Sequence, residues 1–595
     1  MKASACKSLR QLAHTASALA LGSLPIAASA QSAIQPAPTR EEVLRQEIDR
    51  QLREGSEAID ATAAFARAPC PLADTKFANI KLTLASVIFT GAEGVEPGLL
   101  DAAWQGYAGQ EIPVATICDI RDRAAALLRD AGYVASVQVP VQTIESGAVR
   151  FDVVVARLVS FVVRGDTGRS GPMVERYLAP LREQAVFDTR AAERALLLAR
   201  RIPGMDVRMT LARAAGAEAR PGDLVGVVDV INQPFEADLA VQNYGSDEVG
   251  PYGAQARVRI NGLTGLADQT ELSAFATAGF DEQLVVQGRH EFAIGSGGLR
   301  TGVNAVHAWT RPDVVGDDVF YAKTLVANFY ATYPLLLRQA RSLDLSGGLD
   351  IVDQRIDFSD IPFSKDKLRV LTLALDLREA DPASVAGENG FSISEPRWAS
   401  RGRVELRKGI AGLGASDDCG PALAACAAPG VVPISRLNAD PQAFLIRGDA
   451  EFAFRPGRLI TLTGRPRFQW SDDNLLPFEQ FSGGNYTIGR GYDPGAATGD
   501  RGFGGQAEIA VGSLEPRSPT GSGLQGFAFY DTFNAWFADA PGVRNLNSVG
   551  GGARLNFRRR AYAEVLAAVP LEAAPLATRT GNVRILFNLA VRLGG

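Results

Sequence analysis

The sequence predicts an exported chain in which two small α+β units precede an antiparallel β-barrel that crosses a membrane. Three observations predict this fold class: an N-terminal secretory signal, a unit of strands and helices that occurs twice, and a long C-terminal region of alternating apolar and polar residues. Alternation with a period of two is typical of strands. A chain that enters a membrane without long apolar helices has to do so as a closed barrel.

The first 30 residues carry the export signal. Lys2, Lys7 and Arg10 precede an apolar run over residues 16–28, and Ala28-Ser-Ala30 provides a cleavage site. Removal of these three positive charges takes the formal net charge from −5 to about −8, which disfavours nucleic acid as a partner. No later stretch offers about twenty consecutive apolar residues, so we expect no helical membrane span.

Four cysteines remain in the mature chain, namely Cys70, Cys118, Cys419 and Cys426. An even number in an oxidising compartment favours two disulfides, the long pair Cys70–Cys118 and the short pair Cys419–Cys426. Zinc is the alternative, but the chain has only three histidines and none lies near a cysteine in the sequence. We therefore expect no metal and no cofactor.

A charged helix is predicted over residues 39–54, where Thr39 and Glu42 form a capping box. Its apolar stripe is narrow, so it requires polar surroundings. A solvated helix on a flexible tether is one interpretation.

One unit of secondary structure occurs twice between residues 76 and 232, with a period of about 75 residues. Each copy is predicted as strand, helix, helix, strand, strand. The first has these elements at 82–90, 96–104, 117–131, 134–141 and 148–156, and the second at 158–164, 172–183, 189–201, 206–212 and 223–231. An α+β ligand-binding pair is one interpretation. Small sheets also leave strand edges open, to which an extended polypeptide can pair.

Alternation dominates the chain beyond residue 232. The last segment is the clearest case, because Ile585, Phe587 and Leu589 share one face and Arg584 and Asn588 the other. About sixteen such strands follow residue 234, an even number as single-chain barrels require. Soluble β-sandwiches also alternate, but the number of strands and the export signal favour the barrel.

A glycine-rich loop is predicted at residues 481–493, FSGGNYTIGRGYD. Phosphate binding is disfavoured because only part of a G-x-G-x-x-G pattern is present and no helix follows it. On the later strand Phe527, Phe529, Asp531 and Phe533 share one face. A carboxylate facing lipid would cost up to a few kcal/mol, so we predict that this face lines the lumen and that Arg490 pairs with Asp531. An arginine hydrated at an extracellular tip is the alternative.

No group of residues supports catalysis. There is no Ser/His/Asp set, and the histidines are too few for acid–base chemistry. We therefore expect a protein that is not an enzyme.

Several motifs carry a resemblance to one family. Arg490, Gly491 and Tyr492 resemble the loop motif, usually Val-Arg-Gly-Tyr, of the two-partner secretion transporters (TpsB, the haemolysin-activator family). Residues 131–133 (AGY) and 139–147 (VPVQTIESG) resemble the signature of that family's paired POTRA domains. Residues 241–246 (VQNYGS) resemble its first barrel hairpin, and Phe529 with Asp531 its Phe-x-Asp-x-Gly strand.

The chain departs from the family pattern at three places. Ile488 and Gly489 stand where one hydrophobic residue is usual, and Phe533 replaces a glycine, which narrows the room for the loop. The last residues, Leu593-Gly-Gly595, lack the usual terminal aromatic residue.

The resemblance implies a domain order and a topology. The order is a signal peptide at 1–30, a plug helix and linker at 31–75, POTRA domains at 76–157 and 158–233, and a transmembrane barrel at 234–595. Many members place the N-terminal helix in the lumen, the second interpretation of the charged helix. With both termini periplasmic, the insert 411–443 lies outside, and the Arg490 loop follows the eleventh strand and folds into the pore.

The resemblance also implies a function. POTRA domains in the periplasm would capture a large secreted β-helical exoprotein, an adhesin or haemolysin, and the barrel would export it across the outer membrane without ATP. Outer-membrane lipid and the barrel-assembly machinery would be the other partners. A barrel-assembly factor of the same superfamily and a substrate-specific porin are the alternatives.

Overall fold

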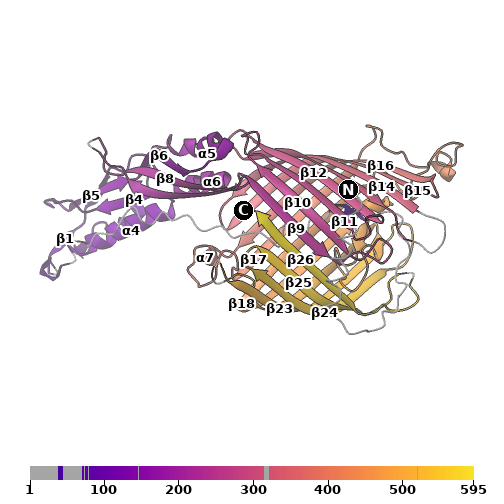
Figure 1. Cartoon of the computed structure of the whole chain (residues 1–595). Coiled ribbons are helices and arrows are strands. Elements are labelled where there is room, and N and C mark those ends of the chain that lie inside the picture. Colours follow the sequence, from indigo (N-terminus) through magenta and orange to yellow (C-terminus); the bar gives the residue numbers. More distant parts are fainter. Residues whose placement is uncertain are drawn as a thin grey trace, which may run out of the picture.

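The computed structural model describes residues 38–44, 70, 72, 74–77, 79–144, 146–216, 218–313, 320–516, 518, 520–575 and 577–594. These residues form two small α+β units at one end of a closed barrel (Figure 1). The expected signal peptide and the expected helix beyond Leu44 lie outside the described residues. Among the described helices, none is long and apolar enough to cross a membrane.

The first unit is a three-stranded sheet covered by one long helix. Its strands β2 (Ser86–Thr90), β5 (Ala148–Val155) and β4 (Ala135–Gln138) lie in the order β2-β5-β4. Helix α4 (Thr116–Asp130) buries Ile117, Ile120, Ala124 and Leu128 against this sheet, at the spacing of one helical face. A two-stranded sheet of β1 (Lys81–Thr83) and β3 (Glu111–Pro113) lies beside it.

Two expectations for the first unit are wrong. The expected strand at 82–90 is divided into β1 and β2, and the expected helix at 96–104 is a series of turns with two 3-10 helices, η5 (Asp101–Ala103) and η6 (Gln105–Tyr107). Gly98 has a φ of 78°, which a right-handed helix cannot contain.

The second unit follows the predicted order. Strand β6 (Arg157–Gly165) precedes a short 3-10 turn, η7 (Gly168–Ser170), and two helices, α5 (Gly171–Leu178, continued by η8, Ala179–Leu181) and α6 (Thr189–Arg200). Strands β7 (Met205–Arg213) and β8 (Asp223–Asn232) complete a sheet in the order β6-β8-β7. Asp188 caps α6 by accepting a 2.8 Å hydrogen bond from the backbone N–H of Arg190.

The second unit is packed onto the barrel. Its apolar core includes Ala267, Ala293 and Leu337 from the barrel. Arg201, at the end of α6, donates two hydrogen bonds to the Asp344 carboxylate at 2.7 and 3.1 Å. Two parallel bonds from one guanidinium restrict orientation as well as distance, so the second unit has one defined position at this mouth.

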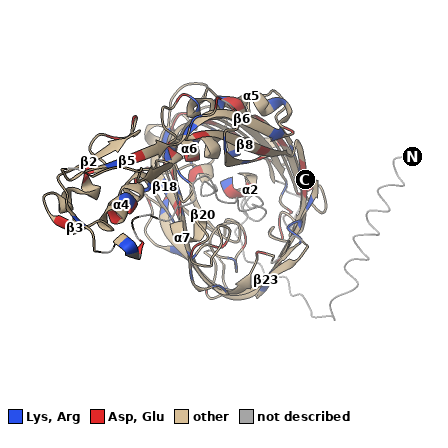
Figure 2. Cartoon of the chain, turned by 90° about the vertical axis from the view of Figure 1, so that its left-hand side faces the viewer, with Lys and Arg blue, Asp and Glu red and all other residues tan. Residues whose placement is uncertain are grey.

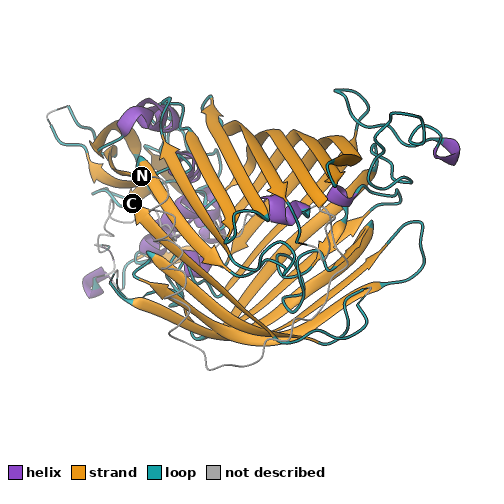
Figure 3. Ribbon diagram, turned by 45° about the vertical axis from the view of Figure 1, so that its right-hand side comes forward, coloured by secondary structure: helices purple, strands orange, loops and turns teal. Residues whose placement is uncertain are grey.

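Sixteen antiparallel strands close the barrel, with β26 paired to β9. The strands of this ring are drawn in orange in Figure 3. They are β9 (Phe235–Gln242), β10 (Gly253–Asn261), β11 (Gln269–Thr277), β12 (Gln283–Ile294), β13 (Leu299–Thr310), β14 (Phe320–Leu337), β15 (Arg341–Phe358), β16 (Ile361–Ala380), β17 (Trp398–Gly409), β18 (Phe444–Gly457), β19 (Ile460–Trp470), β22 (Arg501–Ser513), β23 (Ser522–Trp536), β24 (Arg544–Phe557), β25 (Ala561–Pro570) and β26 (Arg584–Gly594). The expected count of about sixteen is confirmed.

The two faces of the barrel wall differ as the alternation predicts. On β23, Leu524 and Tyr530 are exposed on the outer face, whereas Gln525 and Asp531 are buried on the inner face. The same division holds on β26, where Ile585 and Leu589 face outward and Asn588 inward. An apolar exterior and a polar interior are typical of barrels that cross a lipid bilayer.

The described part of the N-terminal helix, α2 (Arg40–Leu44), lies inside the ring of strands (Figure 2). The backbone N–H and the hydroxyl of Thr39 each donate to the Glu42 carboxylate at 2.8 Å, which is the expected capping box. Val43 packs in an apolar cluster with inward-facing side chains such as Val306, and Glu41 forms a 3.2 Å ion pair with Arg467 of the wall. These residues are therefore in the lumen and not on a solvated tether.

Candidate functional site

The segment between β19 and β22, residues 471–500, enters the barrel, and we call it the pore loop. It follows the eleventh barrel strand, as expected. A 3-10 turn, η10 (Pro477–Glu479), leads into a hairpin of β20 (Phe481–Gly483) and β21 (Ala497–Gly499), which lies inside the ring of strands in Figure 2. The tip between these two strands carries the Arg-Gly-Tyr motif.

Arg490 is anchored on the barrel wall. Its Nε and Nη2 donate to the two carboxylate oxygens of Asp531 at 3.0 and 2.8 Å, and its backbone N–H donates to the same carboxylate at 2.9 Å. Its Nη1 donates to Glu508 at 3.0 Å. Arg490 is 8% exposed and Asp531 is fully buried. The structure thus brings together the two residues that the sequence predicts to pair.

A second arginine completes the cluster around Glu508. Arg554 on β24 donates to both oxygens of Glu508, at 2.5 and 3.0 Å, and to Glu564 on β25 at 2.5 Å. The guanidinium of Arg490 lies 3.5 Å from the ring centroid of Phe529, a cation–π contact. The guanidinium of Arg554 lies 3.8 Å from the ring centroid of Phe527 in the same way. Two guanidinium groups therefore lie among three carboxylates and against two phenylalanine rings.

The sequence analysis missed Glu508, Arg554 and Glu564. The alternation along β22 could have identified Glu508, because Glu508 and Gln506 share the face that points into the lumen. The alternation would not have shown that strands β22 to β25 contribute to one cluster. That arrangement depends on how the strands pair in register.

Gly491 and Tyr492 fit the wall beside this cluster. A Cβ on Gly491 would lie 2.9 Å from the backbone N of Pro570 and 3.0 Å from the Cβ of Ser548, closer than real side chains approach. Tyr492 is 1% exposed, and its hydroxyl lies 2.8 Å from the carbonyl oxygen of Asn547 and 3.0 Å from that of Glu572. The glycine permits close approach, and the tyrosine binds the backbone of β24 and of the segment that follows β25.

The departure at Phe533 is accommodated by the loop itself. Phe533 is fully buried and stacks on Phe481 of the pore loop, with ring centroids 4.9 Å apart. Gly483 faces this ring, and a Cβ there would lie 2.8 Å from it. A missing glycine on the wall is thus matched by a glycine on the loop. At the departure at residues 488–489, Gly489 has a φ of 113°, which suits glycine alone.

Three loops meet at Asp500, the last residue of the pore loop. Asp500 is fully buried. Its carboxylate accepts hydrogen bonds from the backbone N–H groups of Leu475 at 2.9 Å and Ala538 at 2.8 Å. Arg436, from the insert after β17, lies 2.5 Å from Asp500 and 2.8 Å from Asp539. The base of the pore loop is therefore joined to the loops that follow the ninth and thirteenth strands.

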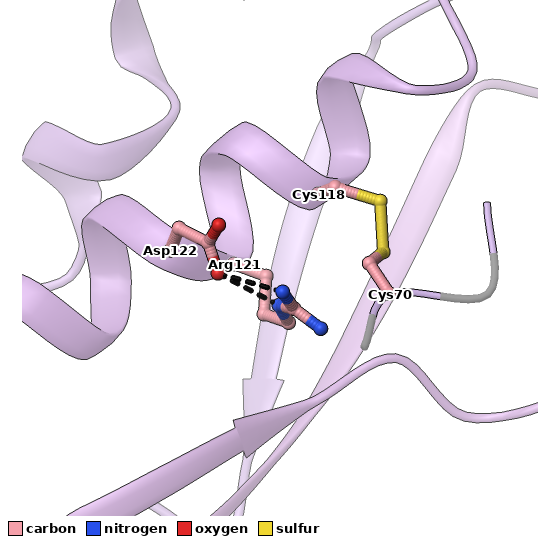
Figure 4. The surroundings of a disulfide bond; sticks show 4 residues. All are labelled: Cys70, Cys118, Arg121 and Asp122. Carbon is pink, nitrogen blue, oxygen red and sulfur yellow. Dashed lines mark hydrogen bonds and ion pairs between the residues drawn. A yellow bond between two sulfur atoms is a disulfide. The ribbon is translucent and has the colours of Figure 1, made fainter. Parts of the chain in front are cut away.

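Both expected cysteine pairs are joined. Cys118 in α4 is bonded to Cys70, and the ion pair of Arg121 with Asp122 lies one turn further along the helix (Figure 4). Cys419 is bonded to Cys426 within the insert between β17 and β18. No group of three or more His, Cys, Asp and Glu side chains in the described part of the chain could hold a metal ion.

Comparison with known proteins gives matches at the level of family and fold. Residues 82–155 match the profile of the POTRA domain of the ShlB type, and residues 392–555 match that of the haemolysin secretion/activation protein ShlB/FhaC/HecB. No curated protein sequence matches the chain.

Two solved structures share the fold over most of their length. CdiB from Escherichia coli has a TM-score of 0.70 and 16% identity, over 93% of this chain and 98% of that chain. CdiB from Acinetobacter baumannii has a TM-score of 0.65 and 17% identity, over 93% of this chain and 97% of that chain.

The matched segments contain both parts on which the sequence resemblance rests. Residues 82–155 cover most of the first unit, and residues 392–555 cover the pore loop, Glu508, Asp531 and Arg554. The barrel and the position of the two units agree with the whole-chain similarity of fold. Residues 82–155 and 392–555 thus match the models of the ShlB/FhaC/HecB haemolysin secretion/activation family, whose members are outer-membrane β-barrel transporters with periplasmic POTRA domains, and the chain as a whole shares the fold of CdiB.

Proposed function

We propose that this transporter captures an unfolded exported protein at its periplasmic end and passes it through the barrel to the cell surface without nucleotide. The proposed client is a large β-helical exoprotein. Its folding outside the cell would supply direction, because it would remove the unfolded chain from the outer end of the pore.

The observation that carries this proposal is the outer edge of β6. Among the described residues β6 pairs only with β8, so one row of its backbone N–H and C=O groups has no partner strand. Val159, Val162 and Val163 on this strand are 41%, 46% and 36% exposed. An extended polypeptide can add to such an edge by main-chain hydrogen bonds, which demand little of its sequence.

The position of this edge supports the same role. The unit that carries β6 is held at the periplasmic mouth by Arg201 and Asp344, and its last strand, β8, leads directly into β9 of the barrel. A client segment bound at β6 would therefore be held close to the opening through which it has to pass. The pore loop lies in the lumen beyond that opening and is held there by noncovalent contacts, which can be broken and formed again.

The test is a double substitution that places charge on the edge, Val159→Asp with Val162→Asp, in cells that also produce a secreted β-helical protein as the client. We expect the amount of exported client to fall at least several-fold, because charged side chains disfavour strand addition at an edge. The amount of assembled barrel should not change.

The matched control is Val141→Asp, because Val141 is fully exposed but lies in the loop after β4. Equal export by the edge variant and this control would contradict capture at β6. Normal export of the client, together with loss of other outer-membrane barrels from the edge variant, would favour the barrel-assembly alternative.

A further inference from the structure

A second charged residue anchors the pore loop at the segment that leads into its hairpin. Glu479, at the end of η10, is 4% exposed. Nε and Nη2 of Arg407 donate to its two carboxylate oxygens at 2.8 and 2.6 Å. Arg447 donates to the same carboxylate at 3.4 Å. Glu479 lies eleven residues before Arg490 in the pore loop, and its bidentate pair joins the loop to other strands.

The wall around Glu479 is built to hold it. Arg407 on β17 is 1% exposed and also donates to Asp350 at 2.8 Å and to Glu405 at 3.3 Å. The backbone carbonyl oxygen of Glu479 accepts hydrogen bonds from Arg447 at 3.2 Å and Gln469 at 2.9 Å. Both the side chain and the backbone of this one loop residue are thus bound by the wall.

The two anchors have opposite polarity. At Arg490 the loop contributes the cation and strands β22 and β23 contribute the carboxylates, Glu508 and Asp531. At Glu479 the loop contributes the carboxylate and strands β17 and β18 contribute the cations, Arg407 and Arg447. The loop is therefore bound by two nearby sectors of the wall, on either side of β19, that bind opposite charges.

The consequences of breaking the two anchors differ. When Glu479 leaves, Arg407 keeps two carboxylates, and Arg447, whose contact with Glu479 is the longer one at 3.4 Å, keeps its 2.9 Å hydrogen bond to the Gln469 side chain. When Arg490 leaves, the carboxylate of Asp531 keeps only the Ser548 hydroxyl, at 3.4 Å. A buried charge without a counter-ion is strongly unfavourable. Opening at Glu479 is therefore the less costly event.

We propose that Glu479 is a second positioning residue of the pore loop and that the loop leaves the pore from the Glu479 end first. Arg490 then holds the tip until Asp531 can be hydrated. The meaning of this opening for export rests on the proposed function, but the opening itself is a property of the chain alone.

The experiment measures the accessibility of the loop in the full-length protein in cells. Ser482→Cys introduces a thiol between the two anchors, at a position that is 4% exposed, and the described cysteines of the chain are all in disulfides. A membrane-impermeant maleimide labels this thiol only when the loop leaves its site. Glu479→Gln should raise the labelling rate about tenfold, which corresponds to about 1.4 kcal/mol.

Arg407→Lys tests the same pair from the wall. Lysine keeps the charge beside Asp350 and Glu405 but cannot hold a carboxylate with two parallel bonds, so labelling should rise here too. This variant decides the question if Glu479→Gln does not assemble, as judged by heat-modifiable mobility in electrophoresis. The matched control is Glu271→Gln, because Glu271 is 7% exposed and binds Arg259 from strand to strand, away from the pore loop.

If both test variants are labelled at the rate of the Glu271→Gln control, Glu479 does not anchor the pore loop. A second reporter, Ile488→Cys near Arg490, tests the order of opening. Glu479→Gln should raise labelling more at position 482 than at position 488, and equal increases would overturn the sequential release. No client protein takes part, so a failure here is distinct from a failure of the proposed capture at β6.

Discussion

At the scale of residues, the pore loop is held by a few buried charged side chains. Arg490 and Asp531 are both nearly or fully buried and make three hydrogen bonds to each other. Charge-assisted bonds of this kind are about twice as strong as neutral ones. The cost of removing both charges from water offsets much of the energy of these bonds. The Arg490–Asp531 pair therefore fixes the position of the loop more than it stabilises the folded protein.

Arg490→Ala and Asp531→Ala should each impair secretion, and the double variant should be less impaired than the two losses combined. Both substitutions break the same contact, and residues in one ion-pair network commonly show a coupling of about 0.5–3 kcal/mol. A double-mutant cycle on secretion and on thiol labelling at position 482 measures this coupling. Full additivity of the two effects would contradict a functional pair.

Gly491→Ala should weaken the seating of the loop, because the new methyl group would meet Pro570 and Ser548 at about 3 Å. Overpacking of this kind typically costs about 1–3 kcal/mol. The control is Gly464→Ala on β19, where a Cβ would have open space. Labelling at position 482 should rise for Gly491→Ala and stay unchanged for Gly464→Ala. Increased labelling for Gly464→Ala but not for Gly491→Ala would show that the loop tip does not need the close contact of Gly491 with Pro570 and Ser548.

At the scale of elements, the first unit depends on a cross-link as well as on its small core. One helix, α4, covers a sheet of three strands, and a core of this size supplies little stability. The Cys70–Cys118 bond ties the segment before β1 to the first turn of α4. We expect this bond to compensate for the part of the unit that forms turns where a second helix was expected.

Loss of the Cys70–Cys118 bond should destabilise the first unit. On the chain-entropy model a cross-link between residues 48 positions apart stabilises by about 4 kcal/mol, less any strain. Thermal unfolding of the double Cys→Ser variant measures the loss. Intact-mass analysis after alkylation without reductant tests the bond itself, and two alkyl groups on Cys70 and Cys118 would contradict it.

At the scale of the whole molecule, the two units differ in their relation to the barrel. The second unit shares its core with Ala267, Ala293 and Leu337 of the barrel, whereas the first unit lies at the far end of the molecule (Figure 1). The proposed capture and conduction would thus lie in separate parts of the chain, but only the first unit can be removed without exposing part of the barrel's apolar surface.

Deletion of residues 76–232 should abolish export and leave an inserted barrel, because the strands that close the barrel begin at β9. The matched control deletes residues 70–156, which removes the first unit and both cysteines of its disulfide and keeps β6. The protein with this smaller deletion should still export part of the client. The measurements are secreted client and heat-modifiable barrel, and unchanged export by the longer deletion would remove the capture role.

Most of the fold could be predicted because it depends on local periodicity. Alternation identified the lumen face of β23, including Asp531, and the period of the soluble half identified two units. The helix at 96–104 failed because one glycine with positive φ outweighs the propensity of its neighbours. At the site, Arg490 and Asp531 are 41 residues apart, and the cost of a carboxylate that faces lipid, together with the family motif, linked them.

The sequence by itself determined the class of the chain, the strand count, the cysteine pairs and one charged contact of the pore loop. Each of these depends on residue spacing or on a short motif. Only the tertiary structure decided that Arg407, 72 residues before Glu479, holds the other end of the loop, and that Arg554 joins Glu508 to Glu564. These contacts depend on strand register and on the path of the loop through the lumen, and a carboxylate on a loop has the same sequence pattern whether it faces water or a buried guanidinium.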